Sequence, residues 1–516
     1  MDSKKLSYKS VYANIRLVYI MIYMITLECV AFIPVRRLTD GHLSLLYNLI
    51  AISGAILLFS DFLTRRVIFK PKYCGLLILF VISVALSSIC NMKYGIADNA
   101  KTIVWTCIQM FLLMAADTEL PVETQKKHFR IITETYCGIW LIGCILSIYE
   151  FLIQYYAIWK LDGTVGKTVE GFFEGRLHGV FTDPNYASLC AVAAIVFAVL
   201  NTKKSLLGKI YHIFAIICFG VYTVLAGSRT TSLVLCIFAF LVGTFLAWNK
   251  LTSLIHIKAV QIIVSLLIGA VCVGIPILGE ASVKYVSTQA ANLYMDIADI
   301  DPSKREVYID PAFRDQIHVP DNTGEISFDR PDVTESSDIS NNRISIWTDY
   351  LNVFKKSPIV GTSPRNALAF AEDHFDSIFI IDRQYSIHNS YLAVLVSTGI
   401  LGTLCLVPWA IATVIEIFGY IIRNRHRQDR FYRRIFLMSS LLVCFAIAAF
   451  PLMFVFFSNM IIDLIFWFSL GYTKSLIRSS EPEKYENEKE TFTYRFLDKF
   501  SKKYSKEKLN KRHNNI

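Results

Sequence analysis

Twelve apolar segments constrain the fold of this chain more than any other feature of its sequence. A helix needs about 20 mostly apolar residues to cross the hydrocarbon core of a bilayer, and most of the segments approach or reach that length. They run over residues 15–35, 43–63, 73–90, 101–116, 133–156, 184–200, 209–226, 230–247, 259–279, 388–420, 434–452 and 454–472. Of the 516 residues, 54% are hydrophobic and 18% are charged, whereas soluble domains carry about 25% charged residues. A soluble protein is excluded, and we expect an all-α polytopic membrane protein with about twelve transmembrane helices.

The distribution of lysine and arginine predicts how these helices are oriented. Short cytoplasmic loops of membrane proteins carry an excess of positive charge. With the N-terminus inside, four basic clusters between the segments fall on the cytoplasmic side, whereas the opposite orientation would place all four outside. The clusters are Arg65/Arg66/Lys70/Lys72, Lys126/Lys127/Arg130, Lys203/Lys204/Lys209 and Arg423/Arg425/Arg427/Arg430/Arg433/Arg434. We therefore expect a multi-pass protein of the cytoplasmic membrane with both termini cytoplasmic.

This orientation divides the chain into four parts. Transmembrane helices 1 to 9 would occupy residues 1–280, and helices 10 to 12 would occupy residues 388–472. Residues 281–387 between them would form one long extracytoplasmic loop, and residues 473–516 a basic cytoplasmic tail. The loop carries 17 acidic and 10 basic side chains, although the whole chain has a net charge of +10. A loop of this length in a compact protein is usually functional or without regular structure.

The two halves of the long loop differ in pattern. The part up to residue 340 is rich in Asp, Pro and Ser and shows no clear period, so we expect much of it, above all the acidic segment 296–340, to be mobile. Residues 341–356 are predicted to form an amphipathic helix that ends before Pro358, because their apolar side chains recur at helical spacing. These side chains are Ile344, Trp347, Leu351 and Phe354.

The tenth apolar segment, residues 388–420, is too long for one straight span. We expect it to enter the membrane as a short helix near His388 and to bend around Gly399 and Gly402.

Arginine and a helix-start motif stand out on the predicted outer face. Arg229 lies between the seventh and eighth segments, where it could extend to the membrane interface or form an anion site with the free N–H groups of the next helix. Arg176 lies in the loop that ends in Asp183-Pro184-Asn185. An acid followed by proline is typical of a helix start, so that tripeptide has a structural explanation of its own.

The end of the long loop holds a further group of candidates. Arg343 and Trp347 share one face of the predicted loop helix, which suits a packing pair or a binding site. His388 is followed by Asn389, Ser390 and Tyr391 where the loop returns to the membrane. Histidine, with an unperturbed pKa of about 6.5, accepts a proton near neutral pH. A single histidine at a helix start can also be structural, so both interpretations stay open.

The order of these pieces resembles that of the O-antigen ligase / polysaccharide polymerase superfamily of bacterial envelope enzymes. The resemblance covers roughly residues 170–420. The matching residues are Arg176, Gly179, Phe181 and Asp183-Pro184-Asn185, then Gly227-Ser228-Arg229-Thr230, then Arg343 and Trp347, Ser357-Pro358 with Gly361, His388-Asn389-Ser390-Tyr391-Leu392, and Gly399 with Gly402. The turn after the loop helix contains less glycine than is usual in the family, and Arg365 and Arg383 in this half of the loop could replace or assist the other arginines.

The resemblance implies a C-type glycosyltransferase whose donor is a glycan linked to undecaprenyl diphosphate. The residues that would bind the donor diphosphate are Arg176, Arg229 and Arg343. His388 would be the catalytic general base, taking the proton of the acceptor hydroxyl. The supporting residues would be Asn389, Tyr391 and Trp347. No metal or other cofactor is implied, because the arginines would neutralise the leaving diphosphate.

The expected process is the biosynthesis of a surface polysaccharide, an O-antigen or a capsule. A polymerase would join repeat units, whereas a ligase would move the glycan to a lipid, wall or protein acceptor; the long acidic loop slightly favours a polymerase. A flippase for the same lipid-linked unit is the alternative from another class. The expected partners are the lipid-linked oligosaccharide, a glycan or lipid acceptor, membrane lipids, and flippase and chain-length proteins, with no nucleic acid.

Overall fold

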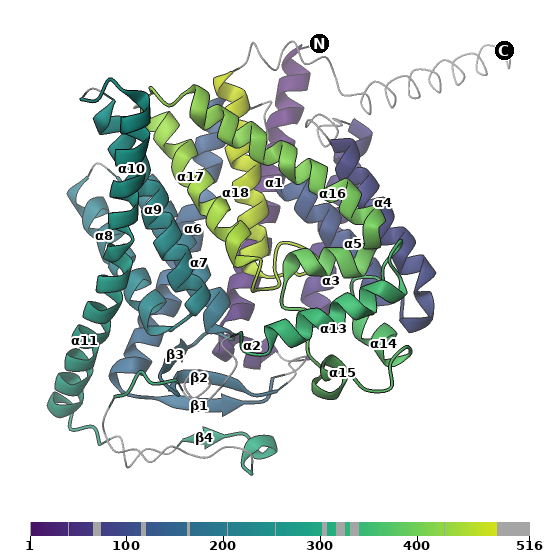
Figure 1. Ribbon diagram of the computed structural model, residues 1–516, viewed down its shortest axis with the longest axis horizontal. Coiled ribbons are helices and arrows are strands. Elements are labelled where there is room, and N and C mark those ends of the chain that lie inside the picture. The colour runs from purple at the N-terminus through teal and green to yellow at the C-terminus, as the bar shows by residue number, and fades with distance from the viewer. Residues whose placement is uncertain are drawn as a thin grey trace.

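The computed structural model describes residues 2–39, 41–64, 74–114, 120–161, 166–203, 205–252, 254–301, 307–315, 326–330, 340–427 and 429–481. The chain is mostly helical in these ranges, with a small sheet at one end of the bundle (Figure 1). Its α-helices are α1 (Asp2–Ala31), α2 (Ile33–Thr39), α3 (Leu43–Thr64), α4 (Cys74–Cys90), α5 (Ala97–Cys107), α6 (Val122–Leu152), α7 (Pro184–Asn201), α8 (Leu206–Leu225), α9 (Arg229–Leu251), α10 (Lys258–Cys272), α11 (Gly274–Ile297), α13 (Arg343–Lys356), α14 (Ala367–Glu372), α15 (Phe379–Arg383), α16 (Ser390–Arg423), α17 (Arg430–Ala448) and α18 (Ile461–Ser480). Short 3-10 turns occupy Met92–Tyr94 and Pro311–Phe313, and a π-helix occupies Ile108–Leu113.

Nine helical stretches in the described part of the chain are long and apolar enough to cross a membrane. They are Val11–Ala31, Leu43–Leu63, Val122–Leu152, Pro184–Asn201, Leu206–Leu225, Arg229–Leu251, Lys258–Ile297, Ser390–Arg423 and Arg430–Ala448. The other three predicted segments are also helical but do not qualify. Helix α4 has 17 residues, α5 has 11, and α18 carries three charged residues. The chain is therefore a polytopic membrane protein.

The bundle has two distinct ends. Helix α1 begins and α18 ends on one side, and the sheet and α13 to α15 lie on the other, which we call the sheet end (Figure 1). Helix α7 is the most enclosed of the nine candidate spans. Large aromatic side chains fill the interior around it, and Trp140, Trp467 and Tyr136 are each 1% exposed or less.

The expectation of an all-α protein is corrected by a four-stranded sheet of order β3-β2-β1-β4. The strands are β1 (Tyr156–Trp159), β2 (Thr168–Phe173), β3 (Arg176–Gly179) and β4 (Tyr308–Ile309). Strand β1 pairs antiparallel with β2 and parallel with β4. Glu174 and Gly175 join β2 to β3, both with positive φ, as in tight hairpin turns. All six residues of β2 are buried, so the alternation that normally indicates a strand is absent from its sequence.

The first part of the predicted long loop also differs from expectation. Helix α11 continues to Ile297, so residues 281–297 are helical. The Asp- and Pro-rich composition that suggested mobility begins only after Ile297. Before it, Lys284 forms an ion pair of 2.8 Å with Glu280, one helical turn earlier, and a pair at this spacing favours a helix. Residues 302–306, 316–325 and 331–339 lie outside the described residues, and the prediction about them stays untested.

The predicted bend in α16 is confirmed at Gly399. This residue has φ 62° and ψ −162°, a conformation that is essentially restricted to glycine. The backbone groups freed by the break are satisfied by the turn that follows α13. The hydrogen bonds run from the N–H groups of Thr362 and Ser363 to the carbonyls of Val396 and Ser397, and from the N–H groups of Ile400 and Leu401 to the carbonyls of Pro358 and Ile359, at 2.8 to 3.2 Å. These four hydrogen bonds replace bonds within the helix at the break, in keeping with the need to pair backbone groups inside a membrane.

Helix α13 covers most of the predicted range 341–356 and ends before Ser357, as expected. Helix α18 begins later than predicted, at Ile461, because residues 451–460 form a buried irregular segment. Asp463 stabilises that segment, since its carboxylate accepts hydrogen bonds of 2.7 Å from the N–H groups of Val455 and Met460. The helix then continues to Ser480, beyond the predicted boundary with the tail. Residues 482–516, most of that tail, lie outside the described residues.

Candidate functional site

Three of the predicted site residues, together with Asp183, lie at the starts of four helices at the sheet end. Asp183 is the N-cap of α7, Arg229 is the first residue of α9, and Arg343 is the first residue of α13. His388 directly precedes Asn389, the N-cap of α16. Because helix N-termini carry partial positive charge, this arrangement favours an anionic ligand at the sheet end.

The position of His388 is set by neighbouring segments. Its backbone has φ 47°, which few residues other than glycine adopt. Tyr350 of α13 donates a hydrogen bond of 2.7 Å to the carbonyl of Tyr385, three residues before His388. After it, the N–H of Ser390 donates to the carbonyl of Ala449 at 2.9 Å. The imidazole Nε2 lies 3.3 Å from the Oγ of Ser386.

The charges of the predicted residues act on one another. Burial and the positive charge of Arg343 lower the pKa of His388, and Asp183 partly opposes this effect. Burial and the charge of Arg229 likewise lower the pKa of Arg343. Burial raises the pKa of Asp183, whereas the N–H of Asn185 and the charge of Arg176 lower it. Since charge interactions weaken with distance, these effects indicate that His388 lies near Arg343 and Asp183, and that Arg343 lies near Arg229.

Arg176 connects the sheet to two of the helices. Its Nε donates a hydrogen bond of 3.0 Å to the carbonyl of Ala226, in the turn before α9. Its Nη2 donates, also at 3.0 Å, to the side-chain oxygen of Asn185 in α7. Arg176 therefore holds the starts of α7 and α9 together beside β3.

Arg330 was missed by the sequence interpretation, because it lies in the half of the loop that was expected to be mobile. Its Nη1 donates a hydrogen bond of 2.6 Å to the carbonyl of Gly227, directly after the carbonyl that Arg176 contacts. Gly175 in the β2–β3 turn has no room for a side chain, because a Cβ there would lie 2.2 Å from the carbonyl oxygen of Asp329. The segment with Arg330 therefore packs on the hairpin. The alternation of Ile326 and Phe328 with polar residues was the available signal.

The three supporting residues have structural contacts. The side chain of Asn389 accepts hydrogen bonds of 3.0 Å from the N–H groups of Tyr391 and Leu392, as a helix cap does. The hydroxyl of Tyr391 donates to the carbonyl of Ala446 in α17 at 2.6 Å. Trp347 packs edge-to-face on Phe450, with ring centroids 5.0 Å apart.

An apolar groove begins beside the candidate site. It has a volume of about 200 Å3 and lies between α16, α17 and α18. Tyr391 lines it, three residues from His388, and Trp409, Ile417 and Phe418 line it further along α16. The groove thus has Tyr391, near the start of α16, and the apolar later part of that helix in its wall.

The two other arginines considered from the sequence lie elsewhere. The Nε of Arg365 donates a hydrogen bond of 3.0 Å to the hydroxyl of Thr102, and its backbone N–H donates to the side chain of Asn99 at the same distance. Arg365 is thus held against α5. Arg383 is exposed on α15. Among the described residues, no group of three or more His, Cys, Asp or Glu side chains is placed to hold a metal ion.

A comparison with protein families gives one match. Residues 213–407 match the model of a family described as O-Antigen ligase. The matched region runs from α8 into α16, so that it includes Arg229, Arg343 and His388 but not Arg176. No curated protein matches the chain.

Proposed function

Since the chain is a multi-pass membrane protein of the O-antigen ligase family, we propose that it transfers oligosaccharide from an undecaprenyl-diphosphate donor in the biosynthesis of a surface polysaccharide. The reaction takes place on the outer face of the cytoplasmic membrane. The observation that carries this proposal is that Arg229, Arg343 and His388, which come from segments far apart in the sequence, lie at helix starts at one end of the bundle and within the region that matches the O-antigen ligase family.

The arginines bind the donor diphosphate in this proposal. Guanidinium groups bind phosphate oxygens with paired hydrogen bonds, and the negative charge on the leaving diphosphate grows as its bond to the sugar breaks. Arg229 and Arg343 contact the diphosphate directly. Arg176 and Arg330 hold consecutive carbonyls of the turn before Arg229, so they also fix the direction of that side chain.

His388 removes the proton of the acceptor. As the acceptor hydroxyl oxygen attacks the anomeric carbon of the donor sugar, its proton passes to the imidazole of His388. The bond between the anomeric carbon and the diphosphate oxygen breaks, and undecaprenyl diphosphate leaves with the electron pair. A lowered pKa keeps His388 neutral, and hence able to accept the proton, at neutral pH. The apolar groove beside Tyr391 accommodates the first part of the prenyl chain.

The acceptor is another lipid-linked repeat unit if the protein is a polymerase. The segments that line the sheet end, including β4 and Arg330, come from the long acidic region, which provides surface for repeat-unit sugars. A ligase would use the same donor chemistry with a lipid, wall or protein acceptor. The broken helix α16 is a feature that transporters also have, but here the turn after α13 occupies the break.

The test is a transfer assay with the purified full chain in detergent and a synthetic undecaprenyl-diphosphate oligosaccharide. Products are resolved by gel electrophoresis and mass spectrometry. We expect a ladder of longer lipid-linked chains, and a rate about 10² to 10⁴ times lower for His388→Ala. Transfer only after a lipid, wall or protein acceptor is added would identify a ligase. No transfer with any acceptor, together with flipping of the lipid in vesicles, would favour the transporter.

A further inference from the structure

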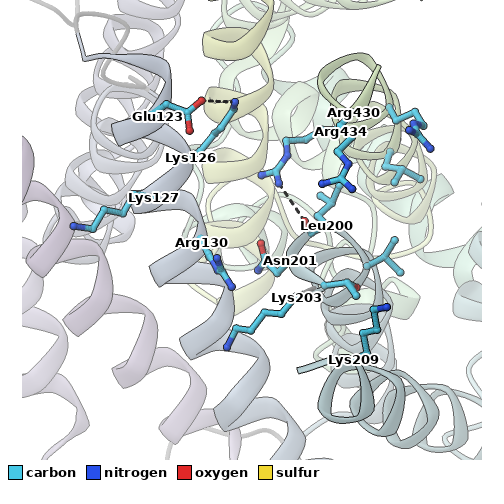
Figure 2. A pocket seen from close by; sticks show the side chains of 14 residues that line it. Glu123, Lys126, Lys127, Arg130, Leu200, Asn201, Lys203, Lys209, Arg430 and Arg434 are labelled. Carbon is cyan, nitrogen blue, oxygen red and sulfur yellow. Dashed lines mark hydrogen bonds and ion pairs between the residues drawn. The ribbon is translucent and has the colours of Figure 1, made fainter. Parts of the chain in front are cut away.

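A second polar hollow lies at the end of the bundle opposite the candidate site. It forms where α6, α8 and α17 begin and where α7 ends, and it has a volume of about 990 Å3 (Figure 2). Helix α7 runs from the candidate site to the hollow, because Asp183 caps its start and Asn201 at its end lines the hollow. The 18 residues of this helix separate them by about 27 Å.

The hollow is strongly basic. Eight basic side chains line it against one carboxylate, that of Glu123. The eight are Lys126, Lys127, Arg130, Lys203, Lys209, Arg430, Arg433 and Arg434. Lys126 pairs with Glu123 at 2.7 Å, and Arg130 lies 3.5 Å from Glu134. Within the described residues, the other six form no ion pair with a carboxylate.

The wall of the hollow is built from the packed bundle rather than from loops alone. Arg434 donates hydrogen bonds of 3.1 Å to the hydroxyl of Tyr472 and to the carbonyl of Leu200, so that it joins α17, α18 and α7. Apolar side chains line the hollow beside the cations, among them Val199 and Leu437. In Figure 2 the basic residues of α6 lie across the hollow from those of α8 and α17.

We propose that this hollow binds the phosphate headgroup of an anionic membrane lipid. Like charges that converge on one concavity repel each other, whereas a solvated basic face would spread them apart. A phosphate anion relieves this repulsion with charge-assisted hydrogen bonds. The four surrounding helices are candidate membrane spans, so the hollow opens at the level where lipid headgroups lie. Basic pockets between membrane helices bind such headgroups, and the apolar side chains contact the adjoining chains of the lipid.

The test measures lipid binding to the purified full chain by native mass spectrometry. The probes are cardiolipin, phosphatidylcholine and inorganic pyrophosphate, the last a soluble phosphate anion. The variant Lys209→Glu/Arg433→Glu reverses two exposed cations of the hollow, and Lys258→Glu/Arg425→Glu reverses two exposed cations outside it at the same end of the bundle. Among the described residues, the side chains of Lys209, Arg433 and Lys258 form no hydrogen bond or ion pair, and that of Arg425 donates only to the nearby carbonyl of Ile422, at 2.8 Å.

We expect cardiolipin to bind the unchanged chain and the Lys258/Arg425 variant equally, and the Lys209/Arg433 variant at least about tenfold more weakly. Binding should also weaken as salt concentration rises. Equal binding to all three proteins would overturn the proposal, as would equal affinity of the unchanged chain for cardiolipin and phosphatidylcholine. If the unchanged chain binds pyrophosphate but not cardiolipin, and the Lys209/Arg433 variant does not bind pyrophosphate, the ligand of the hollow is a soluble phosphate and not a lipid.

Discussion

At the scale of single residues, the candidate site contains a histidine whose pKa is lowered by burial and by the charge of Arg343. His388 has an uncommon backbone conformation, whose free-energy cost of about 1–3 kcal/mol is offset by the contacts of Ser390 and of the residues before it. A general base works only when it is unprotonated. The positive charge of Arg343 therefore serves two purposes in the proposed mechanism, since it attracts the diphosphate and keeps the imidazole neutral.

The pH dependence of transfer follows from this arrangement. His388 is active when neutral, so the rate should fall as the pH drops through its pKa, which lies below the usual 6.5. Replacing Arg343 by Gln removes a nearby positive charge and raises that pKa, so the acid side of the profile of kcat/KM against pH should move to higher pH. Arg383→Gln, on the exposed face of α15, should leave the profile unchanged. An identical acid limb in both variants would show that Arg343 does not act on the base.

The geometry of the arginine contact is tested by Arg229→Lys. Lysine keeps the charge but cannot make the paired hydrogen bonds of a guanidinium, so we expect kcat/KM for the lipid-linked donor to fall about tenfold or more. Arg383→Lys is the matched control and should retain the full rate. Normal kinetics of Arg229→Lys would mean that Arg229 only extends to the membrane interface.

The sequence predicted the site residues that belong to helix starts, because capping residues and isolated arginines have local signatures. Arg330 itself has no such signature, and the alternation of Ile326 and Phe328 with polar residues before it indicates only that the segment packs on something. Its partner could not be inferred, because the contact with Gly227 joins residues 103 positions apart.

At the scale of secondary-structure elements, the break in α16 is the feature most sensitive to a single change. A Cβ at Gly399 would lie 2.3 Å from the carbonyl oxygen of Ile359, and the backbone conformation there excludes other residues.

The same helix, α16, shows how much sequence patterns can predict. The length of the segment predicted the bend, but the turn that fills the break is 36 or more positions away and could not be inferred from periodicity.

We expect Gly399→Ala to destabilise the protein by about 1–3 kcal/mol and to displace the turn after α13. Gly419→Ala in the same helix is the control, since the nearest atom to its new Cβ would be the movable guanidinium of Arg423. Thermal unfolding of both variants in detergent measures the difference. Equal melting temperatures would mean that the turn and the break are not tightly joined.

At the scale of the whole molecule, the two polar regions should face opposite sides of the membrane. The candidate site lies at the sheet end, and the basic hollow lies where the short loops carry their positive charge. Apolar length and charge bias predicted this division but not the sheet, since β2 is buried throughout and β4 pairs with β1, about 150 positions earlier in the chain.

Labelling of single cysteines checks the orientation. The exposed Cys90 is first replaced by Ser. Arg383→Cys should then react with a membrane-impermeant maleimide in intact cells, because α15 lies at the sheet end. His426→Cys, exposed between α16 and α17, should react only after the membrane is opened. The reverse result would invert the predicted topology.

The pairing of β4 with β1 has a consequence for how this protein can be recombined with its relatives. The matched region, residues 213–407, contains β4, Arg330, Arg343 and His388, but β1 to β3 and Arg176 precede it. A chimera that exchanges only this region would set a foreign β4 beside the original β1, and a foreign turn before α9 beside the original Arg176. The smallest unit that can be exchanged intact therefore has to include β1, which begins at residue 156. We expect a chimera to acquire the acceptor specificity of the other protein only when this larger unit is exchanged.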